Sequence, residues 1–438
     1  MIMTNELKDR ISKIRSGEVP EGYKKTKMGI LPNDWNIVKL KDIAQHITKK
    51  NSEMKYTETL TNSAALGIIN QTDYFEKQIS NNNNIDGYYV VEEGDYAYNP
   101  RISVSAPCGP ISKSHISETG IMSPLYTVFR FSDIDDSYYE SYFKSSFWYR
   151  YMNSVANYGA RFDRMNITND DFFSMPLPSP PLPEQQKIAE ILSTQDKVID
   201  LIQNQIEELK KLKKAYLQKM FPQKGSLFPE IRFKGFTDAW EQRELGDMVD
   251  RVTRKNTYLE SNLPLTISAQ YGLIDQNEFF DKRIASKDVS GYFLLKKGEF
   301  AYNKSTSSDA PWGAVKRLDR YENGVLSTLY IVFALKENGN INSDFLVSYY
   351  DTDCWHKGIQ AIAAEGARNH GLLNITPADY FKTTLNVPQN IEEQQQIGTY
   401  FRNLDNLITL HQRKLEQEQQ KKKALMQLLL TGIVRVKI

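Results

Sequence analysis

Two loops in this sequence carry side-chain types that bind DNA. Their candidate contact residues are Tyr98, Asn99, Arg101, Ser103, Ser105, Tyr302, Asn303, Lys304, Ser305 and Thr306. Arginine, lysine and asparagine read guanine and adenine edges in the major groove, while serine, threonine and tyrosine commonly bind phosphates. An alternative interpretation places the tyrosines in a core and gives the asparagines only a turn-forming role.

A second set of polar candidates follows a Gly-Ala pair in each half of the chain. They are Arg161 and Arg164 in the first half, and Arg368 and Asn369 in the second. Both groups precede an Asn-Ile-Thr run, so they occupy equivalent places. They are interpreted either as further DNA contacts or as salt-bridged residues at the entry to a helix.

The sequence offers little for catalysis. It contains no phosphate-binding P-loop and no GxGxxG motif, and its five histidines lack metal-ligand spacing. The run from Asn99 to Ile102 shares only its first two residues with the Asn-Pro-Pro-aromatic motif of amino-methyltransferases. Two cysteines, Cys108 and Cys354, cannot form a disulfide framework or a zinc site by themselves. We therefore predict no catalytic residue, no metal and no bound cofactor.

The chain contains an internal repeat. GYYVVEEGDYAYNP at 87–100 matches GYFLLKKGEFAYNK at 291–304, and SPLYTVFRF at 123–131 matches STLYIVFAL at 327–335. LPEQQKI at 182–188 recurs as IEEQQQI at 391–397. The first block at 87 recurs only at 291, and so long a repeat period indicates duplicated domains and not a solenoid of short repeats.

A long helix is predicted after each half, over 183–222 and 393–430. In both segments, positions taken at alternating steps of three and four residues are mostly apolar, which is typical of a coiled-coil seam. The first seam is predicted at Ile188, Ile191, Gln195, Val198, Ile202, Gln205, Leu209, Leu212 and Tyr216. The second is predicted at Phe401, Leu404, Ile408, His411, Leu415, Glu418, Lys422, Leu425 and Leu429. Isolated long helices gain little stability, so we expect the two to pack on each other as a rod of roughly 55 Å.

Within each half the pattern predicts an α+β fold. Short aromatic and β-branched runs predict strands, and the aromatic segments 137–153 and 343–359 predict amphipathic helices. The expected architecture is two similar mixed domains with short strands, joined and spaced by two long antiparallel coiled-coil helices, with an internal pseudo-two-fold repeat.

Composition is that of an ordinary folded protein of 438 residues with a net charge of +1. No apolar run is long enough to span a membrane, and we expect a cytoplasmic location. The lysine run over 210–224 is interpreted as a solvated helical face or, alternatively, as a surface facing a polyanion.

The passage PLPSPPLPEQQKIAEIL at 176–192, its echo LNVPQNIEEQQQI at 385–397, and the opening WNIVKLKDI at 35–43 resemble the specificity subunit of type I restriction-modification systems. The resemblance covers the chain from about residue 20. It implies two target recognition domains, each reading half of a split DNA sequence, held by two conserved helices. The predicted boundaries are 1–20 for an N-terminal helical segment, 21–182 and 225–390 for the recognition domains, and 183–224 and 391–438 for the conserved helices.

The resemblance also implies partners. The implied partners are double-stranded DNA, two methyltransferase (modification) subunits and a restriction/translocase subunit. No membrane is implied. ATP, magnesium and S-adenosylmethionine would be bound by those other subunits, which leaves this chain non-catalytic. The alternatives are a coiled-coil adaptor whose globular halves bind proteins, and a self-contained DNA methyltransferase or nuclease.

Overall fold

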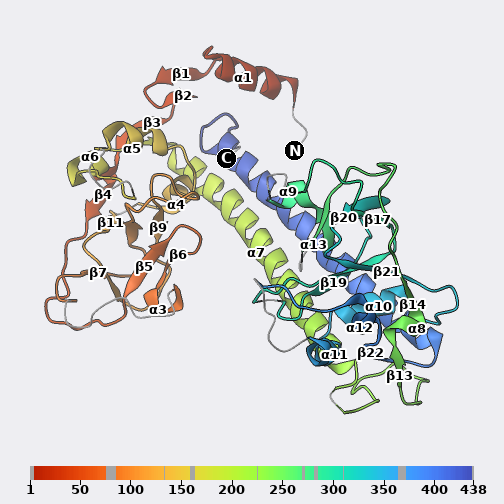
Figure 1. Cartoon of the computed structure of the whole chain (residues 1–438). Coiled ribbons are helices and arrows are strands. Elements are labelled where there is room, and N and C mark those ends of the chain that lie inside the picture. The colour runs from red at the N-terminus through yellow and green to blue at the C-terminus, as the bar shows by residue number, and fades with distance from the viewer. Residues whose placement is uncertain are drawn as a thin grey trace. The chain divides into compact units, whose positions relative to one another are not determined.

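The structure is a computed structural model that describes residues 4–74, 85–132, 134–157, 163–223, 225–268, 272–280, 285–308, 310–363 and 371–436. The chain divides into two compact units (Figure 1). Unit 1 comprises Met1–Leu201 and Leu415–Ile438, and unit 2 comprises Ile202–Lys414. Unit 1 is therefore built from two separate stretches of chain, whereas unit 2 is one continuous stretch.

The helices and strands of the first half follow in this order: α1 (Asn5–Ser16), β1 (Tyr23–Thr26), β2 (Gly29–Pro32), β3 (Asn36–Lys39), α2 (Leu40–Ile43), β4 (Ala44–His46), β5 (Leu60–Ser63), β6 (Gly67–Asn70), α3 (Gln71–Tyr74), β7 (Tyr89–Val91), β8 (Tyr96–Tyr98), β9 (Ile111–Lys113), β10 (Gly120–Met122), β11 (Thr127–Phe131), α4 (Ser137–Phe143), α5 (Tyr149–Val155), α6 (Asn169–Phe173), β12 (Pro176–Ser179) and the long helix α7 (Leu182–Lys219).

The second half repeats most of that order: β13 (Glu241–Glu244), α8 (Leu245–Met248), β14 (Val249–Arg251), β15 (Leu265–Ser268), β16 (Gly272–Asp275), α9 (Gln276–Phe280), β17 (Phe293–Lys296), β18 (Phe300–Asn303), β19 (Ala314–Arg317), β20 (Asn323–Leu326), β21 (Ile331–Leu335), α10 (Ser343–Tyr350), α11 (His356–Ile362), α12 (Pro377–Phe381), β22 (Thr384–Val387) and the long helix α13 (Ile391–Leu429).

Both units are organised around a four-stranded antiparallel sheet. Its strand order is β4-β11-β8-β9 in unit 1 and β14-β21-β18-β19 in unit 2. Small two-stranded sheets surround it, with β3-β12, β5-β6 and β7-β10 in unit 1 matching β13-β22, β15-β16 and β17-β20 in unit 2. The β1-β2 hairpin has no counterpart among the described strands of unit 2. The predicted α+β class and the internal repeat are confirmed.

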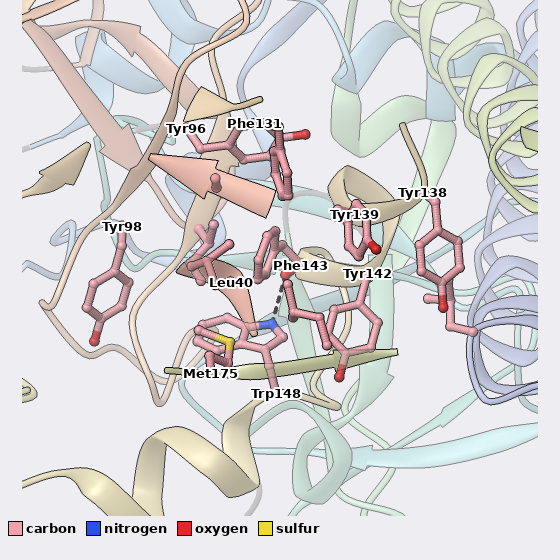
Figure 2. Packing of buried hydrophobic residues seen from close by; sticks show 14 of the residues in the cluster. Leu40, Tyr96, Tyr98, Phe131, Tyr138, Tyr139, Tyr142, Phe143, Trp148 and Met175 are labelled. Carbon is pink, nitrogen blue, oxygen red and sulfur yellow. Dashed lines mark hydrogen bonds between the residues drawn. The ribbon is translucent and has the colours of Figure 1, made fainter. Parts of the chain in front are cut away.

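The main core of unit 1 lies between the sheet and the aromatic helices α4 to α6. Strand alternation places Tyr96 and Tyr98 on that face, while Ala97 faces a smaller cluster on the other side. Figure 2 shows the ring-rich packing, in which the indole Nε1 of Trp148 donates to the Phe143 carbonyl at 3.1 Å. Unit 2 has the same arrangement, in which the indole of Trp355 donates to the Tyr350 carbonyl at 3.2 Å. Aromatic residues thus fix the sheet against the helices in both units.

The helices α7 and α13 run antiparallel within each unit. In unit 1, Glu184 at the start of α7 contacts Arg435 just past the end of α13, and Gln195 further along α7 contacts Glu418. In unit 2, Lys213 contacts Asp405, and Tyr216 lies 5.5 Å from Tyr400 between ring centroids. The partner number falls as the α7 number rises, as antiparallel packing requires.

Both predicted seams are confirmed, apart from one position of α7. All nine positions predicted for α13 are buried or half-buried, so that seam is confirmed. For α7, eight of the nine predicted positions are buried or half-buried, and only Leu212, which is 42% exposed, was wrong. At three of the predicted positions the next residue along the chain, Leu192, Ile199 or Ile206, is more deeply buried than the predicted one. Apolar residues are adjacent in the sequence at 191–192 and 198–199. The spacing alone therefore allows the seam residue after Ile188 to lie either three or four positions further along.

An N-terminal helix precedes the first domain. The α1 helix is capped by Thr4, whose hydroxyl accepts a hydrogen bond from the Leu7 N–H. Arg10 donates to the Ile433 carbonyl at 3.1 Å, and the Tyr23 hydroxyl donates to the Gly432 carbonyl at 2.8 Å. These contacts attach the start of the chain to the segment that follows α13. No helix in the described part of the chain is long and apolar enough to cross a membrane.

Candidate nucleic-acid interface

The first loop (residues 99–109) and the second loop (residues 303–313) share one backbone frame. The Asn99 side-chain oxygen accepts the Arg101 N–H at 3.0 Å, and Asn303 accepts the Ser305 N–H at 3.0 Å. Each loop closes on a glycine in the left-handed region, Gly109 at φ 75° and Gly313 at φ 80°. A Cβ on either glycine would lie 2.0 or 2.2 Å from the asparagine carbonyl oxygen. Only glycine fits there, because of both the backbone conformation and the close approach.

A second segment lies beside each loop. Arg101 pairs with Arg164 in an antiparallel β-bridge, and Ser305 pairs with Leu372 in the same way. The Ile102 N–H donates to the Asp163 carbonyl at 3.0 Å in unit 1. The structure thus brings together Arg101 and Arg164, which are far apart in the sequence. The equivalent positions of unit 2 carry no positive charge.

The structure does not support Tyr98 and Tyr302 as DNA contacts. Their exposed fractions are 3% and 0%, and their hydroxyls donate to the carbonyls of Cys108 and Trp312. Burial raises the pKa of both phenols above the usual value. The prediction was wrong for these two residues because the strand turns its alternate side chains toward the core, as the alternative interpretation has it.

The other predicted residues of the two loops lie at or near the surface. Arg101 and Ser305 are exposed, and the hydroxyls of Ser103 and Ser105 lie 3.2 Å apart. Lys304 and Thr306 are half-buried; Lys304 donates to the Ile375 carbonyl at 3.5 Å, and Thr306 donates to the Gly371 carbonyl at 3.0 Å. The predicted residues Arg161, Arg368 and Asn369 lie outside the described part of the chain.

A cavity of about 610 Å³ opens beside the first loop. The β5–β6 hairpin contributes Asn62, α3 contributes Gln71, and Arg101 and Arg164 also line it. Sequence reasoning missed Asn62 and Gln71. The repeat carries a signal for Gln71, because glutamine recurs at the equivalent position Gln276; Asn62 has no such signal, since Ile267 stands at its place.

The frame and its duplication match a known family. The family model described as the type I restriction modification DNA specificity domain matches residues 32–211 and 237–419. This chain belongs to that family. Unit 1 contains most of the first matched domain and unit 2 most of the second, and the first and second loops belong to the first and second domains.

Relatives from Methanocaldococcus jannaschii agree with this assignment. The putative type I restriction enzyme MjaX specificity subunit is 26% identical over 444 residues, covering 95% of this chain and 97% of that protein. The type I restriction enzyme MjaVIII specificity subunit is 26% identical over 295 residues, covering 61% of this chain. That match spans 64% of the MjaVIII protein, just under two thirds.

A solved structure shows the same fold. The crystal structure of the type I restriction-modification system S subunit from M. genitalium superposes with a TM-score of 0.54 at 14% sequence identity. The match covers 92% of this chain and 96% of that one.

Each specificity domain is fixed to the start of a long helix by a buried glutamate. Glu184 is fully buried and accepts hydrogen bonds from the Trp35 indole at 2.9 Å and from Arg435 at 2.7 Å. Arg435 also binds Asp34, with both pairs of atoms at 2.7–2.9 Å. Hydrogen bonding to Glu184 and Asp34 raises the pKa of this guanidinium, although partial burial opposes the shift.

The second specificity domain repeats this site. Glu393 is 1% exposed and receives two hydrogen bonds from Arg232 at 2.6 and 2.8 Å, and the Trp240 indole lies 3.4 Å from its oxygen. In both units the arginine follows one long helix and the glutamate starts the other. The tryptophans and glutamates recur in the repeat, but the sequence does not show that the two arginines pair with them.

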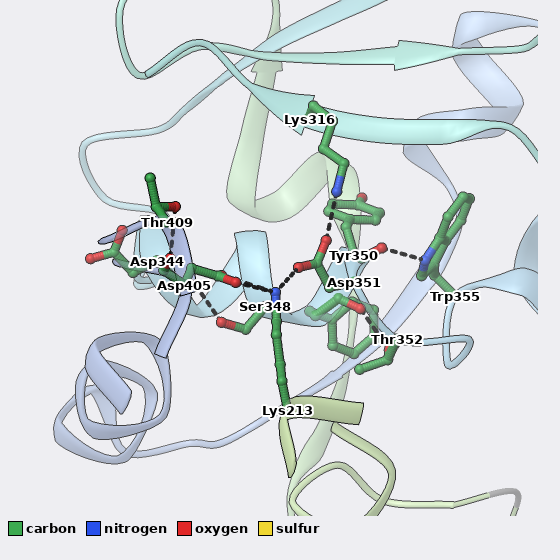
Figure 3. Close-up of polar contacts among 11 residues, drawn as sticks. Lys213, Lys316, Asp344, Ser348, Tyr350, Asp351, Thr352, Trp355, Asp405 and Thr409 are labelled. Carbon is green, nitrogen blue, oxygen red and sulfur yellow. Dashed lines mark hydrogen bonds and ion pairs between the residues drawn. The ribbon is translucent and has the colours of Figure 1, made fainter. Parts of the chain in front are cut away.

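A half-buried ionic network lies between the long helices and the sheet of unit 2 (Figure 3). Lys213 donates to Asp351 at 2.8 Å and to Asp405 at 2.7 Å, and Lys316 donates to Asp351 at 2.7 Å. Burial disfavours the Asp351 carboxylate, but attraction to Lys316 and Lys213 outweighs it and lowers the pKa to about 2.

These contacts clarify the predicted lysine run. Lys213 forms ion pairs within the ionic network, Lys210 forms an ion pair with Glu207, and Lys219 forms an ion pair with Glu230. Lys224 lies outside the described residues. The run is therefore not one continuous surface for a polyanion. The described residues contain no group of three or more His, Cys, Asp or Glu side chains placed to hold a metal ion.

Proposed function

We propose that this chain is the DNA-recognition subunit of a type I restriction-modification complex and reads an asymmetric, split target in double-stranded DNA. The observation that carries the proposal is the pair of loops with one frame and different side chains. Arg101 in the first domain is replaced by Ser305 in the second, although both backbones are held by the same asparagine and glycine. Two such surfaces recognise two different half-sites, residues 21–182 reading one and residues 225–390 the other.

The proposed complex contains two copies of the methyltransferase subunit and a restriction subunit. Two identical partners need the same contact residues twice, so docking residues are expected to be exposed and identical at equivalent positions of α7 and α13. Leu201 and Leu410, which are 59% and 62% exposed, meet this condition. So do Lys214 with Lys423 and Gln218 with Gln427, all of which are exposed. Identical residues of this kind distinguish a docking face from a reading face, where the two halves differ.

The proposed subunit is non-catalytic. Methyl transfer, ATP hydrolysis and DNA cleavage are carried out by the partner subunits, which bind S-adenosylmethionine, ATP and magnesium. In this chain the polar loops and the buried ion pairs serve binding and positioning. We expect the purified chain alone, mixed with DNA and either S-adenosylmethionine or magnesium, to show no turnover. Turnover by the chain alone would identify it as a self-contained enzyme.

The decisive experiment exchanges one domain. Residues 21–182 are replaced by the equivalent part of another specificity subunit, and the methylated sequence is mapped in a host that carries the modification subunits. One half of the split target should change and the other half should remain. An unchanged target would contradict DNA reading by this domain and would favour a protein-binding adaptor. An assembled complex that methylates no split sequence would contradict the recognition role altogether.

A further inference from the structure

Asn62 presents an unpaired acceptor inside the first specificity domain. The residue is 2% exposed, and its side-chain nitrogen donates to the Ala97 carbonyl at 2.7 Å and to the Pro110 carbonyl at 3.1 Å. These two carbonyls fix the orientation of the amide, because the flipped form would place an oxygen against two oxygens. The Oδ1 atom is buried and has no hydrogen-bond partner.

Gln71 supplies a second acceptor of the same kind. It begins α3, and its Oε1 atom is also buried without a partner. Both residues line the cavity of about 610 Å³ beside the first loop. Buried polar atoms in folded proteins are nearly always hydrogen-bonded. Two residues that line one cavity and each carry an unpaired acceptor indicate a ligand that brings hydrogen-bond donors.

The other residues of the cavity narrow the choice of ligand. Arg101 and Arg164 line it and provide positive charge, and Tyr88 and Tyr126 add aromatic surface. Phosphate groups suit the arginines. In the major groove, the exocyclic amino groups of adenine and cytosine are donors, whereas guanine O6 and thymine O4 are acceptors. A base with an amino group therefore fits the two acceptors, and a base with an oxygen at that place is repelled.

We infer that Asn62 and Gln71 form a base-selecting pocket that accepts hydrogen bonds from the amino group of adenine or cytosine, while Arg101 and Arg164 bind neighbouring phosphates. This inference rests on the proposed function of the chain in DNA recognition. It assigns specificity to residues on β5 and α3, outside the loop that the sequence singled out.

The second specificity domain differs at this place in an informative way. Ile267 replaces Asn62 at the same register position, so one acceptor is missing. Gln276 stands where Gln71 stands, and its Oε1 atom is likewise buried without a partner. The two half-sites are therefore read with different donor requirements at the equivalent base.

The first test changes the DNA and leaves the protein intact. The chain is assembled with its modification subunits, its target is determined, and each adenine or cytosine of the half-site read by residues 21–182 is replaced in turn by an analogue that lacks the amino group. Affinity should fall about 10-fold at one position. Full affinity at every position would overturn the inference. Equal binding of the unmodified complex to all sequences would instead overturn the proposed function.

The second test changes the protein. Asn62→Ile copies the second domain, Gln71→Met keeps the side-chain length, and Gln276→Met is the matched control in the other domain. Asn62→Ile and Gln71→Met should each reduce the preference for the amino-bearing base about 10-fold at one position of the first half-site only. Gln276→Met should affect only the second half-site. If Asn62→Ile does not fold, the Gln71→Met variant and the base analogues still test the inference. An unchanged base preference in Gln71→Met together with full affinity for every base analogue would overturn the proposed pocket.

Discussion

The loops that we propose to contact DNA and the ion pairs at the starts of the long helices are duplicated in opposite ways. The loops keep their backbone and change their outward residues, as Arg101 and Ser305 show. The helix starts keep their side chains, with Glu184 and Glu393 each bound to a tryptophan and an arginine. After duplication, the same side chains have been retained where each domain is attached to the start of a long helix. Identity has been lost in the loops that we propose to contact DNA.

The two glutamate sites differ in one respect, and this difference predicts the largest effect. Arg435 has Asp34 as a second partner and a 35% exposed side chain, whereas the Arg232 side chain is 16% exposed and binds Glu393. Glu393→Ala leaves Arg232 buried without its carboxylate and should cost unit 2 about 3–5 kcal/mol of unfolding free energy. Hydrogen exchange resolved by unit measures this loss. Glu184→Ala is the matched variant and should cost unit 1 less, so equal losses would show that Asp34 does not compensate.

The ionic network predicts the second effect, a dependence of stability on pH. The pKa of Asp351 is about 2 in the folded chain and near 3.8 in the unfolded chain, so the folded state favours the ionised form. The resulting stabilisation is present above about pH 4 and is lost as pH falls toward 2; it amounts to about 2 kcal/mol. Unfolding of unit 2 followed by hydrogen exchange from pH 5 to pH 2 measures it. Asp351→Asn should reduce the loss over this range.

The described residues of unit 1 do not form the same network. Lys144 stands four residues before Trp148, as Asp351 stands four residues before Trp355, and it pairs with Glu140 at 2.8 Å. Lys422 pairs with Asp196, as Lys213 pairs with Asp405. The lysine–aspartate pair between the helices is therefore repeated, but its link to the sheet through Asp351 is not. An unaltered pH profile in Asp351→Asn would assign the acid sensitivity of unit 2 to other carboxylates.

The loops predict the third effect. Arg101→Ala removes a charge from the first domain and should weaken DNA binding by about 1–2 kcal/mol and reduce the salt slope by about one. Ser305→Ala removes an uncharged group at the equivalent position and should cost less, about 0.5 kcal/mol. Binding of the assembled complex at several salt concentrations measures both. A loss confined to one base pair, with an unchanged salt slope, would identify Arg101 as a base contact instead.

The seam between the long helices predicts the smallest of the effects on stability. Gln195 and Glu418 face each other in unit 1 at 2.7 Å, whereas the equivalent positions of unit 2 are Leu404 and Leu209. The double variant Gln195→Leu with Glu418→Leu should raise the unfolding free energy of unit 1 by about 1 kcal/mol, because an apolar pair avoids the cost of desolvation. Chemical denaturation resolved by unit measures it. A lower value would show that the polar pair stabilises the seam.

The sequence predicts those features that its repeats preserve and its local patterns define. The α+β class, the duplication and the α13 seam follow from such patterns. The α7 seam also follows from them, except at Leu212, although neighbouring apolar residues such as Val198 and Ile199 allow two registers. Tyr98 was wrongly assigned because its type suits both a core and a DNA contact, and only the pleat of the sheet decides. The pairing of Glu184 with Arg435 spans 251 residues, and no local signal connects them.

The discontinuous composition of unit 1 has a consequence for biosynthesis. Unit 2 is one uninterrupted stretch, so the ribosome can deliver all of it before translation ends. Unit 1 needs Leu415–Ile438, and Arg435 reaches Glu184 only after that last stretch has emerged. The domain that is translated first is therefore the one that is completed last. Until then its buried glutamate lacks its cation, and a ribosome that stalls before residue 435 leaves the first domain unfinished beside a finished second one.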